Sequence, residues 1–341
     1  MGEILVMGGG IAGMQASLDL AAMDHRVFLV EKSNALGGNL LRLDRVFPTN
    51  EKADTIVENY VKMIETETRI MVFKETHLQR VEGKIPTFKI TVEGNGSKKN
   101  LTVASIIIAT GFTPYDVALK REYGCGKFDN VISAIDLENM LRQKNLQKRS
   151  DSKTPNSIVF VQCVGFRDMR AKEYCSSFCC KNTLKNAILL KKEHPNMQTV
   201  VMYMDIRTPS LSEQMYAEAR ELGVRFIRSR PAEVFEKNGK LAIGFENTLT
   251  GKVGSIESDM IVLSVGAVPA EETRDLARMM KLTICETGFF KITSPPSGTG
   301  IPGIFLAGSN CGPKDINYST AEAAAAAVQV NIGLRKVNGK D

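Results

Sequence analysis

The sequence predicts an α/β fold built from two Rossmann-like, three-layer domains. Three observations lead to this prediction. The chain has 341 residues, which is more than one compact core usually holds. Its first fifty residues follow the order strand, glycine-rich turn, helix, strand. An apolar run at residues 157–162, "SIVFVQ", begins a second pattern of the same kind in the middle of the chain.

The composition excludes several classes of protein. Apolar residues make up 43% of the chain and charged residues 24%, as in ordinary globular proteins. The net charge is +6, but the densest basic run, residues 142–153, lacks the aromatic residues of a nucleic-acid groove. No apolar stretch approaches the roughly 20 residues of a membrane span. We therefore expect a cytoplasmic protein that binds no nucleic acid and does not insert into a membrane, and whose seven cysteines are reduced, metal-bound or catalytic.

The first strand, "ILVM", leads into a G-x-G-x-x-G motif. The first glycine permits a tight turn, the second lets the backbone approach a pyrophosphate, and the third lets the helix pack closely on the strand. The N-terminus of that helix offers free N–H groups and the positive end of its dipole to the phosphates. The contacts predicted from this motif are Gly8, Gly10, Ile11, Ala12 and Gly13.

The second strand, "VFLVE", ends in the acidic residue Glu31, which is followed by Lys32. A carboxylate at this point can accept hydrogen bonds from both ribose hydroxyls of a dinucleotide. The glycine pattern alone would be weak evidence, but strand, helix, second strand and terminal acid together predict a dinucleotide site. We include both residues among the predicted contacts.

Three further motifs resemble the two-dinucleotide-domain flavoproteins of the glutathione and thioredoxin reductase superfamily. "NALGGNLLR" resembles their second glycine signature, "SIIIATGFTP" their return motif, and "IPGIFLAGS" the strand that closes the FAD site beneath the flavin. The resemblance implies FAD, and we place the adenine-side backbone contact at Leu78. The other contacts assigned in this way are Gly38, Asn39, Ala109, Thr110, Gly111, Gly308, Ser309, Asp315 and Ile316.

The order of these motifs predicts a split FAD domain of residues 1–148 and 294–341, with an inserted domain at 149–293. A short antiparallel excursion is expected within residues 70–101, where "TFKITVEG" alternates as a strand. We expect residues 41–49 to line the far side of the flavin.

The last helix is expected to begin at Ser319, because Ser319 and Glu322 form an S-x-x-E capping box. In the superfamily this helix points its N-terminus at the flavin ring, where the dipole would stabilise the negative charge of the reduced flavin.

In the middle domain, the turn after residues 157–162 departs from the glycine pattern. It reads Cys163, Val164, Gly165, Phe166, Arg167, so that bulky side chains stand where a pyrophosphate would need bare backbone. We therefore expect this domain to keep the Rossmann-like fold but to bind no pyridine nucleotide.

Three more cysteines follow this turn, in the segment "EYCSSFCCKNTLK". Inert packing suits the isolated cysteines Cys125, Cys285 and Cys311 better than it suits a cluster of four. Two chemical interpretations of the cluster stay open from the residues alone.

The first interpretation is a redox disulfide between Cys175 and Cys179, which would share one face of a helix. The second is a [4Fe–4S] cluster bound by Cys163, Cys175, Cys179 and Cys180. Adjacent ligands can converge only where the backbone bends, for example where a loop enters a helix.

Two long segments, "FVQCVGFRD…EYCSSFCCKNTLKNA" and "GIFLAGSNCGPKDINYSTAEAAAAA", resemble the A-type component of heterodisulfide reductases, and the match covers essentially the whole chain. The resemblance implies that Cys163, Cys175, Cys179 and Cys180 hold a [4Fe–4S] cluster beside FAD, and that Lys185 approaches the reactive edge of the flavin. It also implies partner subunits of the B and C types. We expect the chain to form a homodimer, as its superfamily usually does, or to pair with a paralogue of the A type.

The methanogen proteins carry extra ferredoxin-type cysteine runs at their ends, and this chain has none. The chain thus resembles the short form found in heterodisulfide-reductase-like complexes of sulfur oxidisers. The A-type component of the quinone-interacting membrane-bound oxidoreductase is a near relative of that form.

The resulting prediction is an oxidoreductase subunit that transfers electrons with FAD and a [4Fe–4S] cluster. It would link two-electron thiol–disulfide or sulfur oxidation chemistry to one-electron transfer in a heterodisulfide-reductase-like complex. The alternative is a stand-alone FAD-dependent disulfide reductase that uses a Cys175/Cys179 dithiol.

Overall fold

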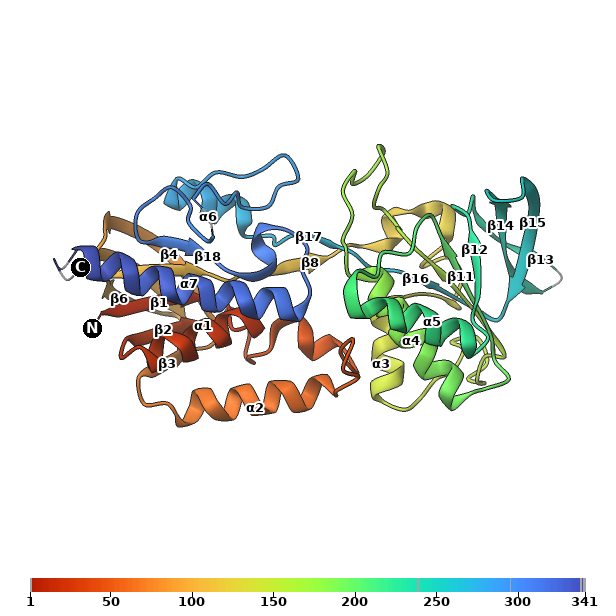
Figure 1. Cartoon of the computed structure of the whole chain (residues 1–341), viewed down its shortest axis with the longest axis horizontal. Coiled ribbons are helices and arrows are strands. Elements are labelled where there is room, and N and C mark those ends of the chain that lie inside the picture. Colours follow the sequence, from red (N-terminus) through yellow and green to blue (C-terminus); the bar gives the residue numbers. More distant parts are fainter. Residues whose placement is uncertain (1, 238, 295, 338, 340–341) are drawn as a thin grey trace. The chain divides into compact units, whose positions relative to one another are not determined.

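A computed structural model of the chain describes residues 2–237, 239–294, 296–337 and 339. The chain forms two compact units, each with its own parallel β-sheet (Figure 1). Unit 1 consists of residues 1–41, 54–113 and 267–341, and unit 2 consists of residues 42–53 and 114–266. The predicted α/β fold with two Rossmann-like units is confirmed.

The sheet of unit 1 has five parallel strands in the order β18-β7-β1-β2-β3. The strands read as almost continuous apolar runs, because a parallel sheet is covered on both faces. Their bounds are β1 (Glu3–Met7), β2 (Arg26–Val30), β3 (Ile70–Phe73), β7 (Ser105–Ile108) and β18 (Ile304–Leu306).

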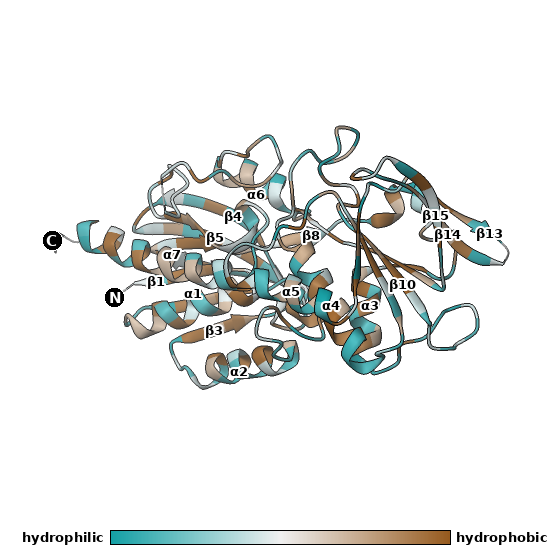
Figure 2. Cartoon of the chain, turned by 45° about the vertical axis from the view of Figure 1, so that its right-hand side comes forward, coloured by the Kyte–Doolittle hydropathy of each residue, from teal (hydrophilic) through white to brown (hydrophobic). Residues whose placement is uncertain are grey.

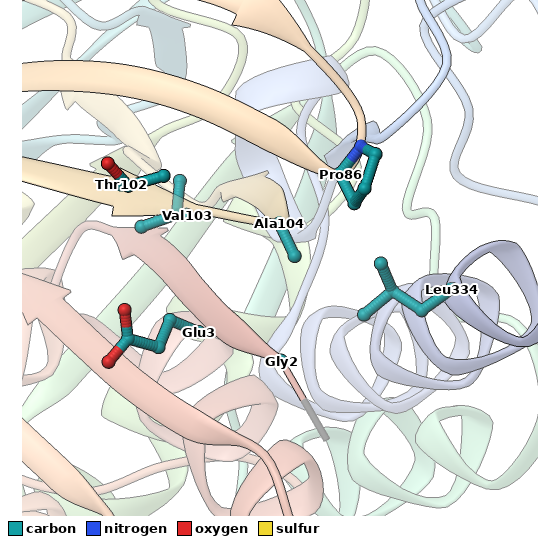
Figure 3. Close-up of a pocket in the computed structure, with 7 residues that line it drawn as sticks. All are labelled: Gly2, Glu3, Pro86, Thr102, Val103, Ala104 and Leu334. Atoms are coloured by element: carbon teal, nitrogen blue, oxygen red, sulfur yellow. The ribbon is translucent and has the colours of Figure 1, made fainter. Parts of the chain in front are cut away.

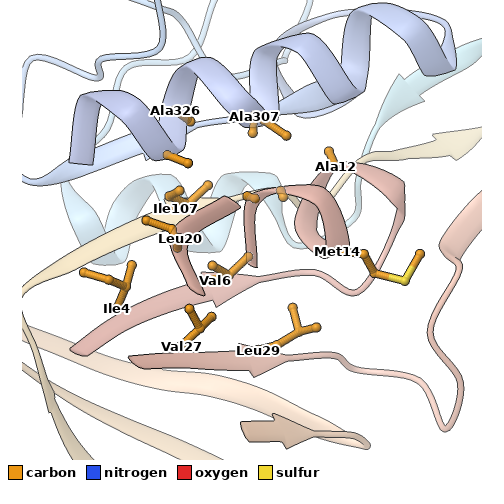
Figure 4. Packing of buried hydrophobic residues seen from close by; sticks show 14 of the residues in the cluster. Ile4, Val6, Ala12, Met14, Leu20, Val27, Leu29, Ile107, Ala307 and Ala326 are labelled. Carbon is orange, nitrogen blue, oxygen red and sulfur yellow. The ribbon is translucent and has the colours of Figure 1, made fainter. Parts of the chain in front are cut away.

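Helices α1 (Ile11–Ala22) and α7 (Ile316–Val337) pack on one face of this sheet. Figure 4 shows Leu20 of α1 lying over Ile4, Val27 and Ile107 of three neighbouring strands. The residues of α7 that join this core are mainly alanines, and their small side chains let the two helices approach closely. Helix α2 (Ala53–Thr66) precedes β3.

The other face of the sheet is covered by the antiparallel strands β4 (Thr76–Lys84), β5 (Thr87–Gly94) and β6 (Ser97–Val103) and by α6 (Thr273–Met280). Alternate residues of β5, namely Phe88, Ile90 and Val92, enter the core. This is the predicted antiparallel excursion. Short strands β8 (Phe112–Pro114) and β17 (Ala267–Pro269) also pair with each other.

The sheet of unit 2 repeats the parallel arrangement in the order β12-β11-β10-β16-β9. The helices of this unit supply apolar residues to a single core with the strands, and Figure 2 shows the hydrophobic colour of β10. The bounds are β9 (Val131–Ser133), α3 (Ala134–Arg142), β10 (Ser157–Val161), α4 (Cys179–Glu193), β11 (Gln198–Tyr203), α5 (Glu213–Glu221), β12 (Arg225–Arg228) and β16 (Met260–Leu263). A second, antiparallel sheet in this unit consists of β13 (Val234–Lys237), β14 (Lys240–Asn247) and β15 (Lys252–Ser258).

The unit boundaries differ from those expected at 148/149 and 293/294. The first lies earlier because β9 hydrogen-bonds to β16 and α3 packs in the core of unit 2. The second lies earlier because α6 packs in the core of unit 1. Residues 42–53 also belong to unit 2, so that the expected flavin-lining segment, residues 41–49, lies almost wholly in that unit.

Helix α7 begins at Ile316, three residues before the predicted start, so the predicted capping box is wrong. Asp315 takes the capping role, because its Oδ1 accepts a hydrogen bond from the Tyr318 N–H at 3.1 Å. The Glu322 carboxylate binds Lys314 instead. A competing side chain four residues upstream of Ser319 therefore decided where the helix starts.

A pocket of about 280 Å³ in unit 1 lies at the start of β1 and the end of β6 (Figure 3). Its lining includes Glu3, Pro86 and Leu334, and none of the predicted site residues. Among the described residues, no helix is both long and apolar enough to span a membrane.

Gly13→Ala is expected to lower the free energy of unfolding, because the added Cβ would lie only 1.8 Å from the backbone oxygen of Gly8. Overpacking costs about 1–3 kcal/mol, and contact with a backbone atom places this variant at the upper end. Urea denaturation measures the change. Gly333→Ala in α7 is the matched control, because its Cβ would meet nothing nearer than 3.8 Å and alanine is the better helix former. Equal stability of the two variants would contradict the packing argument.

Candidate cofactor sites

The predicted dinucleotide contacts of unit 1 gather at one edge of its sheet. Gly8 follows β1, Glu31 follows β2, Ala109 follows β7, and Gly308 comes shortly after β18. These four strands are adjacent in the sheet and parallel, so their carboxyl ends meet at the same edge. Open α/β sheets bind their ligands outside this edge.

The glycine motif leaves the backbone bare where a phosphate would approach. Gly8 has a φ of +101°, and a Cβ there would lie 2.4 Å from Ala109 O. A Cβ at Gly10, by contrast, would meet nothing nearer than Gly38 Cα at 4.0 Å. Gly10 caps α1 without a side-chain hydrogen bond, so the N–H groups at Ile11 and Ala12 begin a helix whose end no side chain caps.

The second glycine signature lies against the first. Gly37 N–H donates to Gly9 O at 2.8 Å, and a Cβ at Gly38 would come within 3.1 Å of Gly10 Cα. Asn39 donates from Nδ2 to Phe112 O at 3.0 Å, which ties this signature to the segment after the return motif. The structure thus brings together glycines that are nearly thirty positions apart in the sequence.

Glu31 is buried, and both of its carboxylate oxygens are hydrogen-bonded. Oε2 accepts from Gly9 N–H at 2.6 Å, and Oε1 accepts from the Ser33 N–H at 2.7 Å and its hydroxyl at 2.6 Å. Lys32 forms an ion pair with Glu272 at 2.8 Å. Leu78 lies in β4 with its side chain in the core.

Two buried polar atoms at this edge have no hydrogen-bond partner among the described residues. One is the hydroxyl oxygen of Thr110, and the other is Oδ1 of Asn310, whose Nδ2 donates to Ile108 O at 2.6 Å. A Cβ at Gly111 would have no described atom within 4 Å, so space lies beside the return motif. Unsatisfied polar groups beside bare backbone fit a large polar ligand such as FAD.

Sequence reasoning missed a polar cluster at the start of α7. Lys314 Nζ lies 2.9 Å from Cys311 Sγ and 2.5 Å from Glu322 Oε1, so Cys311 is more than the packing cysteine we expected. Burial raises the pKa of Cys311, and Lys314 opposes that shift. The spacing of a cysteine and a lysine three residues apart, just before a helix, is the signal that could have pointed to this cluster. Ser309 lies beside it and donates to Lys314 O at 3.3 Å.

The four clustered cysteines lie at the carboxyl edge of the second sheet, in the connection from β10 to α4. Cys163 follows β10, and Cys179 and Cys180 are the first two residues of α4. The adjacent pair therefore sits where a loop enters a helix, as convergence of the two side chains requires. Cys175 lies in the loop before α4, so the expectation that Cys175 and Cys179 share a helix face is wrong.

The turn after β10 has an unusual backbone. Positive φ angles at Cys163, Gly165 and Arg167, of 56°, 73° and 54°, alternate with the negative φ of Val164 and Phe166. Alternation of this kind can turn successive N–H groups to one side of the chain and form a nest, which cradles anions and iron–sulfur clusters.

Aromatic rings pack against one another at this turn. Phe166 packs edge-on against Tyr115 and Tyr174, with ring centroids 5.3 and 5.4 Å apart. A Cβ at Gly266, on the next strand connection, would lie 2.3 Å from the Phe166 ring. This packing favours the expectation that unit 2 binds no pyridine nucleotide.

The clustered cysteines influence one another electrostatically. Burial raises the pKa of Cys163 to about 11, and Cys180 and Cys175 add to that shift. A hydrogen bond with Cys179 lowers the pKa of Cys180 to about 7, and raises that of Cys179.

Among the described residues, no group of three or more His, Cys, Asp or Glu side chains could hold a metal ion. In a [4Fe–4S] cluster each thiolate binds a different iron atom, so these sulfurs need not approach as closely as ligands of one ion. Three buried thiols and the half-buried Cys175, all in one connection between a strand and a helix, supply the four sulfur ligands that the Cys₄ ligation of such a cluster needs.

Lys185 lies on α4 and is buried. Its Nζ donates to both oxygens of Glu138, at 2.7 and 2.8 Å, and to Arg45 O at 2.8 Å. Burial lowers the pKa of Lys185, and the Glu138 carboxylate opposes that shift. Glu138 also accepts hydrogen bonds from Asn186 Nδ2 and Asp44 N–H. Lys185 is thus no surface lysine, and its approach to the flavin stays a prediction.

The loop that carries Cys175 is fastened at its base by Asp168. This carboxylate is only 4% exposed and accepts hydrogen bonds from Lys120 at 2.9 Å and from Arg230 at 2.5 Å. The hydrogen bond from Lys120, together with Arg170 N–H and Arg230, holds the pKa of Asp168 well below its usual range. The ion pairs hold the loop between two other segments of unit 2.

The family model described as pyridine nucleotide-disulphide oxidoreductase matches residues 2–161 and 191–329, which is most of the chain. The chain belongs to this family. The internal stretch that the family model leaves unmatched, residues 162–190, contains all four clustered cysteines and Lys185.

Curated relatives of this family member confirm the predicted resemblance. The iron-sulfur component of type A from the CoB–CoM heterodisulfide reductase of Methanocaldococcus jannaschii is 33% identical over 97% of this chain and 64% of the relative. The protein of the same name from Methanopyrus kandleri, numbered A 1, is 32% identical with the same coverage. The chain therefore spans less than two thirds of these relatives. The first alignment has 419 positions, more than the chain's 341 residues, so that relative carries extra residues inside the aligned region as well.

Solved structures with the same fold include thioredoxin reductases. The enzyme of Lactococcus lactis, in its FR conformation, has a TM-score of 0.67 at 20% identity, over 98% of this chain and all of that one. The T. acidophilum enzyme has a TM-score of 0.66 at 14% identity, over 99% of this chain and 98% of that one. The protein is an oxidoreductase with a flavin-dependent redox role, and FAD is the cofactor that its family and the unit 1 site imply.

Glu138→Gln and Lys185→Met are each expected to lower the free energy of unfolding by about 3–5 kcal/mol, because each leaves a buried charge unpaired or a buried network incomplete. The double variant is expected to lose less than the sum, because both charges are then gone. Urea denaturation of the four proteins measures the coupling. Strictly additive losses would contradict a direct interaction between the two side chains.

Asp168→Asn is expected to destabilise the protein by about 1.5–3 kcal/mol at neutral pH, since it weakens hydrogen bonds from two cations. A lowered carboxyl pKa stabilises the fold above the unfolded pKa of about 4, and this stabilisation is lost as pH falls below it. The stability difference between wild type and variant should therefore shrink below about pH 4. Asp151→Asn is the control, since Asp151 pairs with Lys148 on the exposed surface and should change little. A difference that is constant down to pH 2 would refute the assignment.

Proposed function

We propose that this protein is the FAD- and [4Fe–4S]-containing electron-transfer subunit of a heterodisulfide-reductase-like complex. It would connect two-electron thiol–disulfide or sulfur oxidation chemistry with one-electron transfer. FAD exchanges one or two electrons and a [4Fe–4S] cluster carries one, which is the chemistry that such a connection needs.

One observation carries the proposal. The clustered cysteines Cys163, Cys175, Cys179 and Cys180 occupy the internal stretch where the chain departs from its oxidoreductase family. In a Rossmann-like unit, this strand-to-helix turn is the place of the nucleotide phosphates. Here the turn combines thiols, positive φ angles and packed aromatic rings, which favour thiolate ligation over phosphate binding.

Different residues of the chain would bind the two cofactors. Backbone N–H groups at Gly10 and the start of α1 would bind the FAD pyrophosphate, and Glu31 would receive the ribose hydroxyls. The four cysteines would hold the cluster as thiolates. The buried Lys185–Glu138 pair would keep α4, which begins with two of the ligands, in a fixed position relative to α3. Lys185 is also our proposed residue at the flavin edge.

The proposal includes partner subunits. The curated relatives are named as the A-type component of CoB–CoM heterodisulfide reductases. We propose that this chain likewise works as a homodimer, or with a paralogue of its own type, together with B- and C-type subunits in the cytoplasm. The disulfide or sulfur chemistry would then take place on a partner, because this chain contains no C-x-x-C pair.

The proposal is tested by iron analysis and EPR spectroscopy of the chain purified without air. We expect about four iron atoms per chain and a cluster signal after reduction with dithionite. Cys180→Ala should lose most of the iron and the signal. Cys285→Ala is the matched control, because Cys285 lies in unit 1 and hydrogen-bonds to Thr287 and Phe289 O.

A yellow but iron-free protein, or unchanged iron in Cys180→Ala, would refute the proposal. The stand-alone disulfide reductase would be supported instead if the iron-free protein formed a reversible Cys175–Cys179 disulfide. Mass spectrometry detects this disulfide.

A further inference from the structure

We propose that Arg167 is a positioning residue that compensates the negative charge of the four-cysteine site and raises the reduction potential of the group bound there. Arg207 would add to this effect from across Asp205. The inference rests on the proposed iron–sulfur function and goes beyond it, since it assigns a role to a residue that is not a ligand.

Arg167 is held by Asp205, whose backbone oxygen contacts one of the four cysteines. Its guanidinium Nη2 lies 2.7 Å from Asp205 Oδ2, and Arg207 Nη2 lies 3.5 Å from the same oxygen. The backbone oxygen of Asp205 lies 3.7 Å from Cys180 Sγ. One residue, just after β11, thus joins two guanidinium groups to the cysteine site.

The guanidinium of Arg167 also acts on Cys163, the first of the four cysteines along the chain. Burial raises the pKa of Cys163, and the charge of Arg167 opposes that rise. Its Nη1 is buried and has no hydrogen-bond partner among the described residues. A guanidinium has five N–H donors, so Arg167 still has donor capacity at a buried atom.

Partial burial strengthens the electrostatic effect of the Arg167 charge. The Arg167 side chain is 23% exposed, whereas that of Arg207 is 47% exposed. Charges act more strongly on each other where water is excluded, so Arg167 should have the larger effect of the two. Asp205 neutralises part of the positive charge, but two guanidinium groups face one carboxylate, and a net positive charge remains.

The direction of the effect follows from charge balance. Reduction adds one electron to a group that four thiolates already make negative. A nearby cation and hydrogen bonds to the sulfurs stabilise the reduced form more than the oxidised form, and iron–sulfur potentials respond to both. Loss of Arg167 should therefore make the group harder to reduce. A role limited to bracing the loop would leave the potential unchanged in any variant that still holds iron.

The test compares Arg167→Gln, Arg167→Lys and Arg207→Gln with the wild type by redox titration monitored by EPR, on protein prepared without air. Arg167→Gln should shift the reduction equilibrium toward the oxidised form at least tenfold, which is 59 mV for a one-electron couple. Arg167→Lys keeps the charge and should restore at least half of this shift. Arg207→Gln should shift it in the same direction by less. Arg149→Gln is the matched control, because Arg149 pairs with Asp136 in the same unit and should leave the equilibrium unchanged.

Iron content, flavin content and circular dichroism are measured on every variant. A wild type with cluster and an unshifted Arg167→Gln would overturn the inference and leave the proposed function intact. Loss of iron from both Arg167 variants, with flavin and fold retained, would also overturn it, because the side chain would then serve only to brace the loop. If Arg167→Gln does not fold, Arg207→Gln decides the matter by the presence or absence of its shift. A wild type without iron would overturn the inference and the proposed function together.

Discussion

A β-strand that turns directly into a helix brings backbone groups together at the carboxyl edge of a parallel sheet, and the side chains at that turn decide what can bind there. In unit 1 the turn after β1 is made of glycines so closely packed that a Cβ at Gly13 would overlap the Gly8 oxygen. The backbone of Gly10, where a Cβ would meet nothing nearer than 4.0 Å, stays open to a phosphate. In unit 2 the turn after β10 carries Cys163, Phe166 and Arg167, and the same position offers sulfur and a cation instead.

Buried charge in unit 2 is arranged in pairs that hold the cysteine loop and the helix after it. Glu138 accepts hydrogen bonds from Lys185 on α4, from Asn186 and from the backbone of residues 42–53, so one carboxylate connects three segments. Asp168 does the same for the loop itself. Burying such groups is costly unless every partner is present. Loss of either carboxylate would therefore remove a charged partner from a buried lysine in this unit.

The comparison of prediction and structure has a clear physical pattern. Features that depend on local backbone requirements were predicted correctly, such as the strands around Gly8 and the antiparallel strands near Phe88. The predicted helix start at Ser319 was wrong, because Asp315 caps the helix and α7 begins at Ile316. The Cys311–Lys314–Glu322 cluster was missed because its members meet only once the loop before α7 has folded. Sequence-based boundaries failed where a strand joined a sheet far away along the chain, as β9 joined β16.

By itself, the sequence determined the fold class, the dinucleotide turn of unit 1 and the departure from that turn at Cys163, because each depends on the size and backbone freedom of consecutive residues. Only the tertiary structure decided which residues share a unit and which charges are paired. Pairs such as Lys185–Glu138 and Arg167–Asp205 join residues from different elements. Their geometry depends on how helices and strands pack, and no local pattern along the chain encodes it.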